Sequence, residues 1–254
     1  MSKMQDLEGQ SLWLDNISRE ILVSGELAGL VEAGLKGLTS NPAIFEKAIS
    51  SGNIYDAEIG RLKAEGSSPL EIYEQLAVSD IQAAADVLGP VYEATAGQDG
   101  YVSLEVNPHL AHDAAGTVTE ARRLHAAVDR PNLMIKVPAT AAGFEAISAL
   151  IEAGICVNVT LLFAVEQYRA AANAYLTGLE RRQAKGLPLE GLASVASLFI
   201  SRLDSALDPE FDRLNRAELR GRLAVDNARL AYGVFEEIMA GPRWAALKGA
   251  RPQR

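Results

Sequence analysis

Residues 133–140 place a lysine in the middle of a short apolar run. The run reads Leu-Met-Ile-Lys-Val-Pro-Ala-Thr, and aliphatic residues on both sides of Lys136 are typical of a buried strand. A lone ammonium group inside a packed sheet is costly to desolvate. Desolvation also favours the neutral amine, which is the form of lysine that attacks a carbonyl carbon. The run therefore predicts a lysine with a chemical role.

Other short apolar runs carry polar groups near their ends. Asp15 closes the run 11–15, Glu105 lies near the end of 101–106, and Asn158 and Thr160 lie in 155–160. Because side chains alternate between the two faces of a strand, these groups fall on the face opposite the aliphatic ones. An amine with two carboxylates and several amide or hydroxyl groups suits Schiff-base chemistry. The amine attacks a ketone, an acid removes the carbinolamine hydroxyl, and a base takes the proton of the bond that breaks.

Two further runs end in the same way. Asn41 closes the run 37–41, while Ser197 and Phe199 close 193–199 and precede Arg202. A structural role is an alternative for Asn41, Asn158 and Ser197, because buried polar groups are normally hydrogen-bonded to a loop or a helix end. The alternative for Lys136 is a buried ion pair with Glu105 or Asp15, although such pairs contribute uncertainly to stability. For Arg202 the alternative is a local pair with Asp204.

The apolar runs alternate with segments of helical periodicity. The predicted strands are 11–15, 37–41, 101–106, 133–137, 155–160 and 193–199, and the predicted helices are 54–64, 69–87, 117–128, 141–153, 165–183 and 217–239. This alternation indicates an α/β fold with a parallel sheet. Eight strands close a (β/α)8 barrel. After the sixth strand only helix is predicted up to Arg254, so the sheet is open or the barrel is incomplete.

The bulk properties limit the classes of function. The chain has 254 residues and a formal charge of −9, which disfavours nucleic-acid binding but allows a small anionic substrate in a local basic pocket. The length suits one domain over 1–254. The single cysteine excludes an internal disulfide and favours a cytoplasmic setting. We expect no signal peptide and no membrane span, because no apolar segment is long enough.

Other motifs give weaker signals. His109 and His112, followed by Asp113, have a spacing that suits metal ligation, but the sequence has no third or fourth partner of that spacing, so a role at a helix N-terminus or in a loop is favoured. Cys156 lies in an apolar run and is most simply a core residue. The alternative of a cysteine nucleophile lacks an evident histidine base. The sequence has no glycine-rich phosphate loop.

Six segments resemble the transaldolase family of class I Schiff-base enzymes. They are Trp-Leu-Asp at 13–15, Gly-Leu-Thr-Ser-Asn-Pro at 37–42, Ser-Leu-Glu-Val at 103–106, Ile-Lys-Val-Pro-Ala-Thr at 135–140, Asn-Val-Thr-Leu-Leu-Phe at 158–163 and Ser-Leu-Phe-Ile-Ser-Arg-Leu-Asp at 197–204. The segments follow the order of the family and cover nearly the whole chain. The resemblance implies a TIM-type barrel and transfer of a dihydroxyacetone unit between sugar phosphates in the pentose phosphate pathway. It implies no metal or organic cofactor.

The resemblance also implies roles for individual residues. Lys136 would be the Schiff-base lysine, Glu105 and Thr160 would hold the water that relays protons, and Asp15 would take the proton from the hydroxyl next to the breaking carbon–carbon bond. The implied substrate contacts are sugar hydroxyls for Asn41, Asn158 and Ser197, the pocket wall for Phe199, and the phosphate group for Arg202, whose fork suits that anion.

The sequence departs from the family at its end. Members continue from a segment like 248–254 into a seventh strand with further phosphate ligands and then an eighth, and this chain stops before both. We therefore expect a truncated barrel. Two alternatives to a transaldolase stay open at this point. One is an inactive or fragmentary homologue, and the other is a related Schiff-base aldolase acting on a sugar phosphate.

Overall fold

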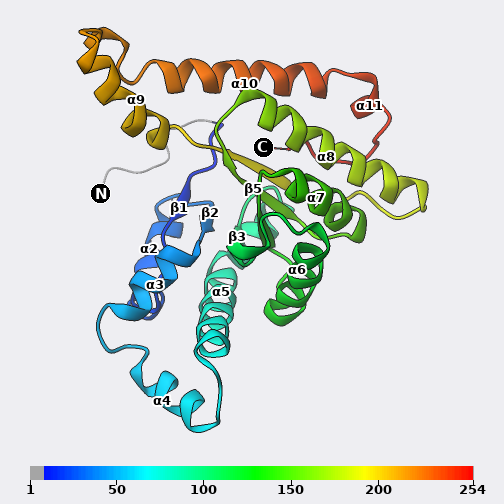
Figure 1. Cartoon of the computed structure of the whole chain (residues 1–254). Coiled ribbons are helices and arrows are strands. Elements are labelled where there is room, and N and C mark those ends of the chain that lie inside the picture. The colour runs from blue at the N-terminus through cyan, green and yellow to red at the C-terminus, as the bar shows by residue number, and fades with distance from the viewer. Residues whose placement is uncertain (1–8, 254) are drawn as a thin grey trace. The chain divides into compact units, whose positions relative to one another are not determined.

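The computed structural model describes residues 9–253 and shows an α/β fold built on one sheet (Figure 1). The strands are β1 (Trp13–Asp15), β2 (Gly37–Thr39), β3 (Tyr101–Glu105), β4 (Leu133–Pro138), β5 (Val157–Leu162) and β6 (Ser194–Leu198). Their order in the sheet is β1-β2-β3-β4-β5-β6. Consecutive order is that of a (β/α)8 barrel, whereas the order reverses in a doubly wound sheet. The predicted fold class, an incomplete TIM-type barrel with six strands, is confirmed.

Helices follow every strand. They are α1 (Arg19–Val23), α2 (Glu26–Glu32), α3 (Pro42–Ser50), α4 (Asp56–Ala64), α5 (Pro69–Ala94), α6 (Ala114–Val128), α7 (Ala141–Ala153), α8 (Val165–Ala184), α9 (Ser201–Arg213), α10 (Leu223–Met239) and α11 (Pro242–Ala245), with 3-10 turns η2 (Pro108–Leu110) and η3 (Ala217–Leu219). None of the helices formed by the described residues is both long and apolar enough to cross a membrane.

The chain divides into two compact units. Unit 1 comprises the residues up to Glu105 together with Arg122–Ile135, and unit 2 comprises Val106–Ala121 and the residues from Lys136 onward. The division falls inside β4, between Ile135 and Lys136. Unit 1 therefore carries β1, β2, β3 and the start of β4, and unit 2 carries the end of β4 with β5 and β6.

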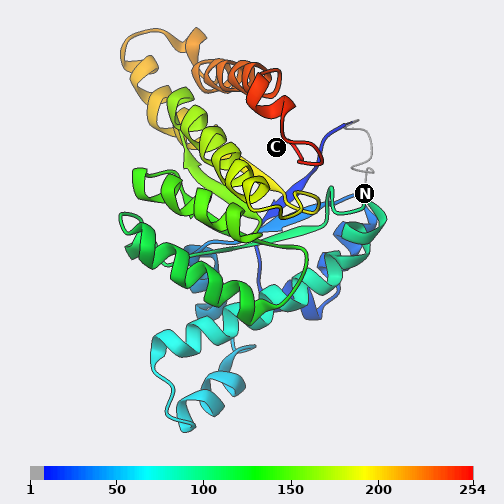
Figure 2. The same cartoon turned by 90° about the vertical axis from the view of Figure 1, so that its right-hand side faces the viewer.

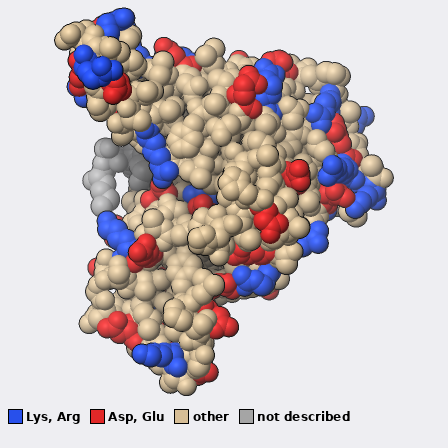
Figure 3. Space-filling view, viewed as in Figure 1, with Lys and Arg blue, Asp and Glu red and all other residues tan. Residues whose placement is uncertain are grey.

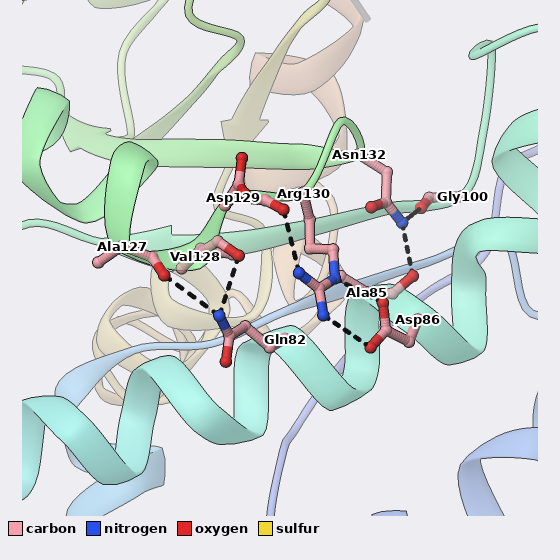
Figure 4. Close-up of polar contacts among 9 residues, drawn as sticks. All are labelled: Gln82, Ala85, Asp86, Gly100, Ala127, Val128, Asp129, Arg130 and Asn132. Carbon is pink, nitrogen blue, oxygen red and sulfur yellow. Dashed lines mark hydrogen bonds and ion pairs between the residues drawn. The ribbon is translucent and has the colours of Figure 1, made fainter.

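In unit 1 the long helix α5 is tied to the start of β4 by side-chain hydrogen bonds (Figure 4). Asn132 is buried and donates to the carbonyl oxygens of Ala85 on α5, at 2.9 Å, and of Gly100 before β3, at 2.8 Å. Arg130 holds the carboxylate of Asp86 through two nitrogens. These bonds fix the backbone where the chain leaves α6 and enters the sheet.

Helix α5 is longer than its periodicity predicts. The predicted helix 69–87 stops before Gly89 and Pro90, but the observed helix continues to Ala94. Proline removes the hydrogen bond to the carbonyl four residues earlier, here that of Asp86. Because Pro90 and Asp86 are both exposed, water can satisfy that carbonyl. The start at Ser68 is fixed by a capping box with Glu71.

In unit 2 the helices α7 and α8 pack side by side, as Figures 1 and 2 both show. The contact is close at Gly178 on α8. A Cβ atom there would lie 2.7 Å from the Ser148 carbonyl oxygen and 2.7 Å from Cβ of Ile151 on α7. Only a residue without a side chain allows this approach. The predicted helix 141–153 is confirmed at both ends, with Thr140 as the N-cap and Gly154 as the C-cap in a left-handed conformation.

The predicted helix 217–239 is wrong as a single element. Residues Arg220–Arg222 break it, with Gly221 at φ +67°, so that η3 and α10 are separate. Two of its large apolar side chains, Leu223 and Leu230, are 50% and 65% exposed. The buried side chains are those of Ala224, Ala231 and Val234, and α10 packs on α8. Small side chains allow close helix packing, which a count of large apolar residues cannot predict.

The segment from α9 to η3 carries charges of both signs on its surface, at the upper left of Figure 3. Arg213 pairs with Glu210, Arg220 with Asp212, and Arg216 with Glu218. All of these side chains are largely exposed, so each pair contributes little to stability.

The close contact at Gly178 gives a first prediction. We expect Gly178→Ala to lower the free energy of unfolding by about 1–3 kcal/mol, because the added carbon meets backbone and cannot be accommodated by a rotamer change. Gly233→Ala on α10 is the matched control, since nothing lies within 4 Å of its Cβ position. That change should stabilise the protein by about 0.5–1 kcal/mol. Urea unfolding measures both, and equal effects of the two substitutions would contradict the packing described.

Candidate active site

In unit 1 the strand register aligns polar side chains on one face of the sheet. Asp15 pairs with Thr39, and Thr39 pairs with Ser103. Residues paired across parallel strands point to the same face, and Glu105 shares that face because it is two residues beyond Ser103. The sequence prediction that Asp15 and Glu105 share a face agrees with this register. Asp15 is exposed, whereas Glu105 is half-buried at the carboxyl end of β3.

Thr39 is a site candidate that the sequence analysis missed. Its hydroxyl oxygen is buried, and within the described residues it has no hydrogen-bond partner. It stands in the row between Asp15 and Ser103. A threonine at a strand end gives no distinctive sequence signal, because threonine is also common in ordinary strands.

Asn41 acts as the N-cap of α3. Its side-chain oxygen accepts a hydrogen bond from the backbone N–H of Ile44 at 3.0 Å, and Pro42 occupies the first helical position. The preceding Ser40 is fully buried and donates to the Ser103 carbonyl at 2.7 Å. Asn41 therefore has the structural role that the sequence analysis considered for it, a hydrogen bond to a helix end. The cap also places Asn41 directly after β2, at the carboxyl end of the strand.

Tyr73 on α5 is electrostatically linked to Glu105. Burial, together with the negative charge of Glu105, raises the pKa of Tyr73 to about 12. The Tyr73 ring also meets Phe45 on α3 edge-on, with ring centroids 6.2 Å apart. The phenol is therefore neutral near pH 7. Tyr73 lies far from every predicted strand end in the sequence, so only the tertiary structure reveals its link to Glu105.

In unit 2 Lys136 lies beside Asn158. Lys136 is 5% exposed and Asn158 is 2% exposed. The backbone hydrogen bond from Ala139 N–H to the Thr160 carbonyl, at 2.9 Å, sets the register of β4 against β5. That register aligns Lys136 with Asn158, and in a parallel pair aligned side chains point to the same face.

Asn158 is in turn bonded to β6. Ser197 donates its hydroxyl hydrogen to Oδ1 of Asn158 at 2.9 Å. The interaction connects adjacent strands through side chains on the face that carries Lys136. The structure thus brings Asn158 and Ser197 together. Their hydrogen bond gives each of these polar groups the protein partner that the sequence analysis considered as the alternative to substrate binding.

Thr160 sits at an irregularity in β5. The pairing with β6 shifts between Val159 and Leu162, and Leu161 has a left-handed backbone at φ +61°. A bulge of this kind places two residues opposite one on the partner strand and changes the direction of the side chains. Thr160 itself is 1% exposed. Thr160, a predicted catalytic residue, thus lies within the bulge.

Phe199 and Arg202 are in contact after β6. The guanidinium carbon of Arg202 lies 4.7 Å from the centroid of the Phe199 ring. A cation over an aromatic face is held by the ring quadrupole. The Phe199 ring also stacks on Phe163, with centroids 5.3 Å apart and an interplanar angle of 27°. Arg202 is exposed near the start of α9, so its charge is accessible to an anion.

The weaker motifs have local explanations. Asn107 accepts from the backbone of His109, and Asp113 accepts from the backbone N–H of Gly116 at the start of α6. In residues 9–253, no group of three or more His, Cys, Asp or Glu side chains is placed to bind a metal ion. Cys156 is buried, and burial raises the pKa of its thiol. A neutral thiol is a poor nucleophile.

Comparison with known proteins identifies the family. The sequence model described as "Transaldolase/Fructose-6-phosphate aldolase" matches residues 12–249. The chain belongs to this family. It is 51% identical to transaldolase 1 of Streptomyces coelicolor over 248 residues, covering 96% of this chain and 65% of that protein. It is 50% identical to the transaldolase of Thermobifida fusca over 261 residues, covering the whole of this chain and 71% of that protein.

The chain thus spans about two thirds of the length of these transaldolases. Of the nine residues that the family resemblance assigns, Asp15, Asn41 and Glu105 belong to unit 1. The other six belong to unit 2, and are Lys136, Asn158, Thr160, Ser197, Phe199 and Arg202. In unit 2 the structure brings Lys136 beside Asn158, Asn158 beside Ser197, and Phe199 beside Arg202.

The bond between β5 and β6 gives the second prediction. Ser197→Ala removes a donor from the buried Oδ1 of Asn158, so we expect the free energy of unfolding to fall by about 1–2 kcal/mol. Ser205→Ala, at an exposed position on α9, is the control and should change it by less than about 0.5 kcal/mol. Urea unfolding provides the measurement. A Ser197→Ala protein as stable as the parent would show that the bond is not needed to satisfy Asn158.

Proposed function

We propose that the chain is a transaldolase that moves a dihydroxyacetone unit through a Schiff base on Lys136. The donors would be ketose phosphates such as sedoheptulose 7-phosphate or fructose 6-phosphate. The acceptors would be aldose phosphates such as glyceraldehyde 3-phosphate or erythrose 4-phosphate. The observation that carries the proposal is the burial of Lys136, which is 5% exposed in a central strand of the sheet. The chain that holds it belongs to the transaldolase/fructose-6-phosphate aldolase family.

The first half of the proposed reaction forms the imine. Nζ of neutral Lys136 attacks the ketone carbon, and the resulting carbinolamine loses its hydroxyl as water. Glu105 and Thr160 would hold a water that carries protons to and from the carbinolamine. The burial of Thr160 at 1% exposure and its place within the bulge support a fixed position for this hydroxyl.

The second half breaks and re-forms a carbon–carbon bond. Asp15 would take the proton from the hydroxyl next to that bond, so that the aldose leaves and its bonding electrons pass to the imine as an enamine. The enamine carbon then attacks the aldehyde of the acceptor, and Asp15 returns the proton to the new alkoxide. Hydrolysis of the imine regenerates Lys136. Every atom and electron in this sequence comes from the substrates and water, so the proposed mechanism uses no cofactor.

The remaining residues would bind the substrate. In this proposal Asn41, Asn158 and Ser197 contact sugar hydroxyls, Phe199 forms part of the pocket wall, and Arg202 binds the phosphate group. The contact of Arg202 with the Phe199 ring supports its role, because a guanidinium placed before binding loses less freedom on meeting an anion. The proposal places the chain in the pentose phosphate pathway of the cytoplasm, where a thiol such as Cys156 stays reduced.

Trapping of the imine tests this function. After incubation with fructose 6-phosphate and borohydride, we expect a covalent adduct that peptide mapping locates at Lys136. Lys136→Arg should abolish the adduct, because a guanidinium does not form an imine under these conditions. Lys185→Arg should leave it unchanged, since Lys185 is an exposed lysine paired with Glu152. Absence of an adduct on the parent chain would reject the proposal and favour an inactive homologue.

A fructose-6-phosphate aldolase is the second candidate, because the description of the matching family names that activity as well. Transfer and simple cleavage differ in the fate of the dihydroxyacetone unit once the aldose has left. For a transaldolase we expect product from an added acceptor aldose phosphate and little free dihydroxyacetone without it. Chromatography of the two reactions measures the difference. Equal release of dihydroxyacetone with and without acceptor would indicate the aldolase.

A further inference from the structure

Phe163, directly after β5, has both of its backbone polar groups bound by side chains from two helices. Gln167 on α8 accepts from the backbone N–H of Phe163 at 3.0 Å. Asn227 on α10 donates to its carbonyl oxygen at 2.9 Å. Gln167 also accepts from the next N–H, that of Ala164, at 3.1 Å as part of the cap of α8. Residues that come after a strand lack ladder partners and usually reach water, so the two side-chain bonds to Phe163 restrict its position.

The ring of Phe163 is connected to Arg202 through the ring of Phe199. It stacks on Phe199, and the guanidinium of Arg202 lies over the Phe199 ring. The backbone reinforces the arrangement, because Phe199 N–H donates to the Leu162 carbonyl at 2.8 Å. A connected path of contacts therefore runs from α8 and α10 through two aromatic rings to one cation.

The bulge in β5 brings Phe163 into register with Phe199. Leu161 occupies the left-handed region, which is unfavourable for a side chain with a Cβ. Such strain persists only where the surrounding structure imposes it. Without the extra residue, the alternation of β5 would turn Leu162 and Phe163 to the opposite faces. The strained backbone at Leu161 thus lies at the position that sets the direction of the Phe163 ring.

Burial argues against a purely structural role for this pair of rings. Phe163 and Phe199 are only half-buried, and Arg202 is exposed. The largest fully buried side chains of the described chain, among them Tyr55, Tyr101 and Tyr175, lie elsewhere. A ring pair that stabilises a core is normally removed from water more completely.

We propose that Phe163 is a positioning residue that fixes Arg202, through Phe199, to receive the phosphate group of the substrate. The inference rests on the proposed function, which assigns that phosphate to Arg202. Arginine has many rotamers, and one that is already restrained loses less entropy when it binds a phosphate with its planar fork. Phe163 itself touches neither the substrate nor the reacting atoms in this proposal.

The test measures binding of inorganic phosphate by calorimetry at low salt. Phe163→Leu removes the ring but keeps an apolar side chain, and we expect it to weaken phosphate binding about fivefold. Phe163→Tyr keeps the stack and should bind within about twofold of the parent. The matched control is Phe235→Leu, which removes a ring from the Tyr232–Phe235 pair on α10 and should leave phosphate affinity unchanged.

A double substitution separates positioning from general damage. If Phe163 acts through Arg202, phosphate binding to the Phe163→Leu/Arg202→Met protein should be no weaker than to Arg202→Met alone. A further loss in the double variant, equal to that of Phe163→Leu in the parent, would overturn the inference. Unchanged phosphate binding in Phe163→Leu would overturn it as well. If Phe163→Leu fails to fold, Asn227→Leu replaces it, since it removes only the donor to the Phe163 carbonyl and should also weaken phosphate binding.

Trapping with a phosphate-free ketone distinguishes this inference from the proposed function. Dihydroxyacetone with borohydride should label Lys136 equally in the parent and in Phe163→Leu, because no phosphate is involved. Failure of the parent to trap dihydroxyacetone would count against the Schiff-base function. Trapping in both proteins together with equal phosphate affinity would reject only the role of Phe163. A parent and an Arg202→Met protein with the same phosphate affinity would also overturn the inference.

Discussion

Parallel hydrogen bonding between short strands is the constraint on which the candidate site depends. In a parallel ladder the register decides which side chains share a face, and the carboxyl ends of neighbouring strands meet at one edge. In unit 1 this aligns Asp15, Thr39 and Ser103. In unit 2 it aligns Lys136 with Asn158 and sets Ser197 within reach of Asn158. A slip of one residue would turn every one of these groups to the other face.

The helices hold that register with small side chains and specific polar contacts. Gly178 lets α8 approach α7, and Ala224 and Ala231 are buried on α10, which packs on α8. Asn132 secures the entry to β4 by bonding two carbonyl oxygens. Close packing leaves the strand ends little freedom, because protein interiors transmit displacement rather than absorb it. The packing of the helices thus determines where the polar groups at the strand ends lie.

Periodicity in the sequence predicts the regular elements well wherever it is strong. All six strands are confirmed, and the helix 141–153 is correct to the residue because a threonine cap and a glycine stop bound it. Prediction fails where local signals conflict with tertiary contacts. The predicted end of α5 lies before Pro90, yet this proline is inside the helix on its exposed side. The short helices α1, α2, α3 and α11 are not predicted, because segments of four to nine residues contain too few turns for a helical period to show. Helix α9 is not predicted either, and none of its side chains is buried.

The sequence by itself determined the chemical inventory of this protein. A lysine within an apolar strand and carboxylates near the ends of two other strands indicated Schiff-base chemistry, because residue type and spacing record what a site can do. Six ordered motifs that resemble those of transaldolases indicated the family. Only the tertiary structure showed how these groups are positioned: the bond from Ser197 to Asn158, the link of Tyr73 to Glu105, and the contact of Arg202 with a Phe199 ring that stacks on Phe163. The partners in these contacts are separated by up to tens of residues, and such contacts arise from packing that no local pattern encodes.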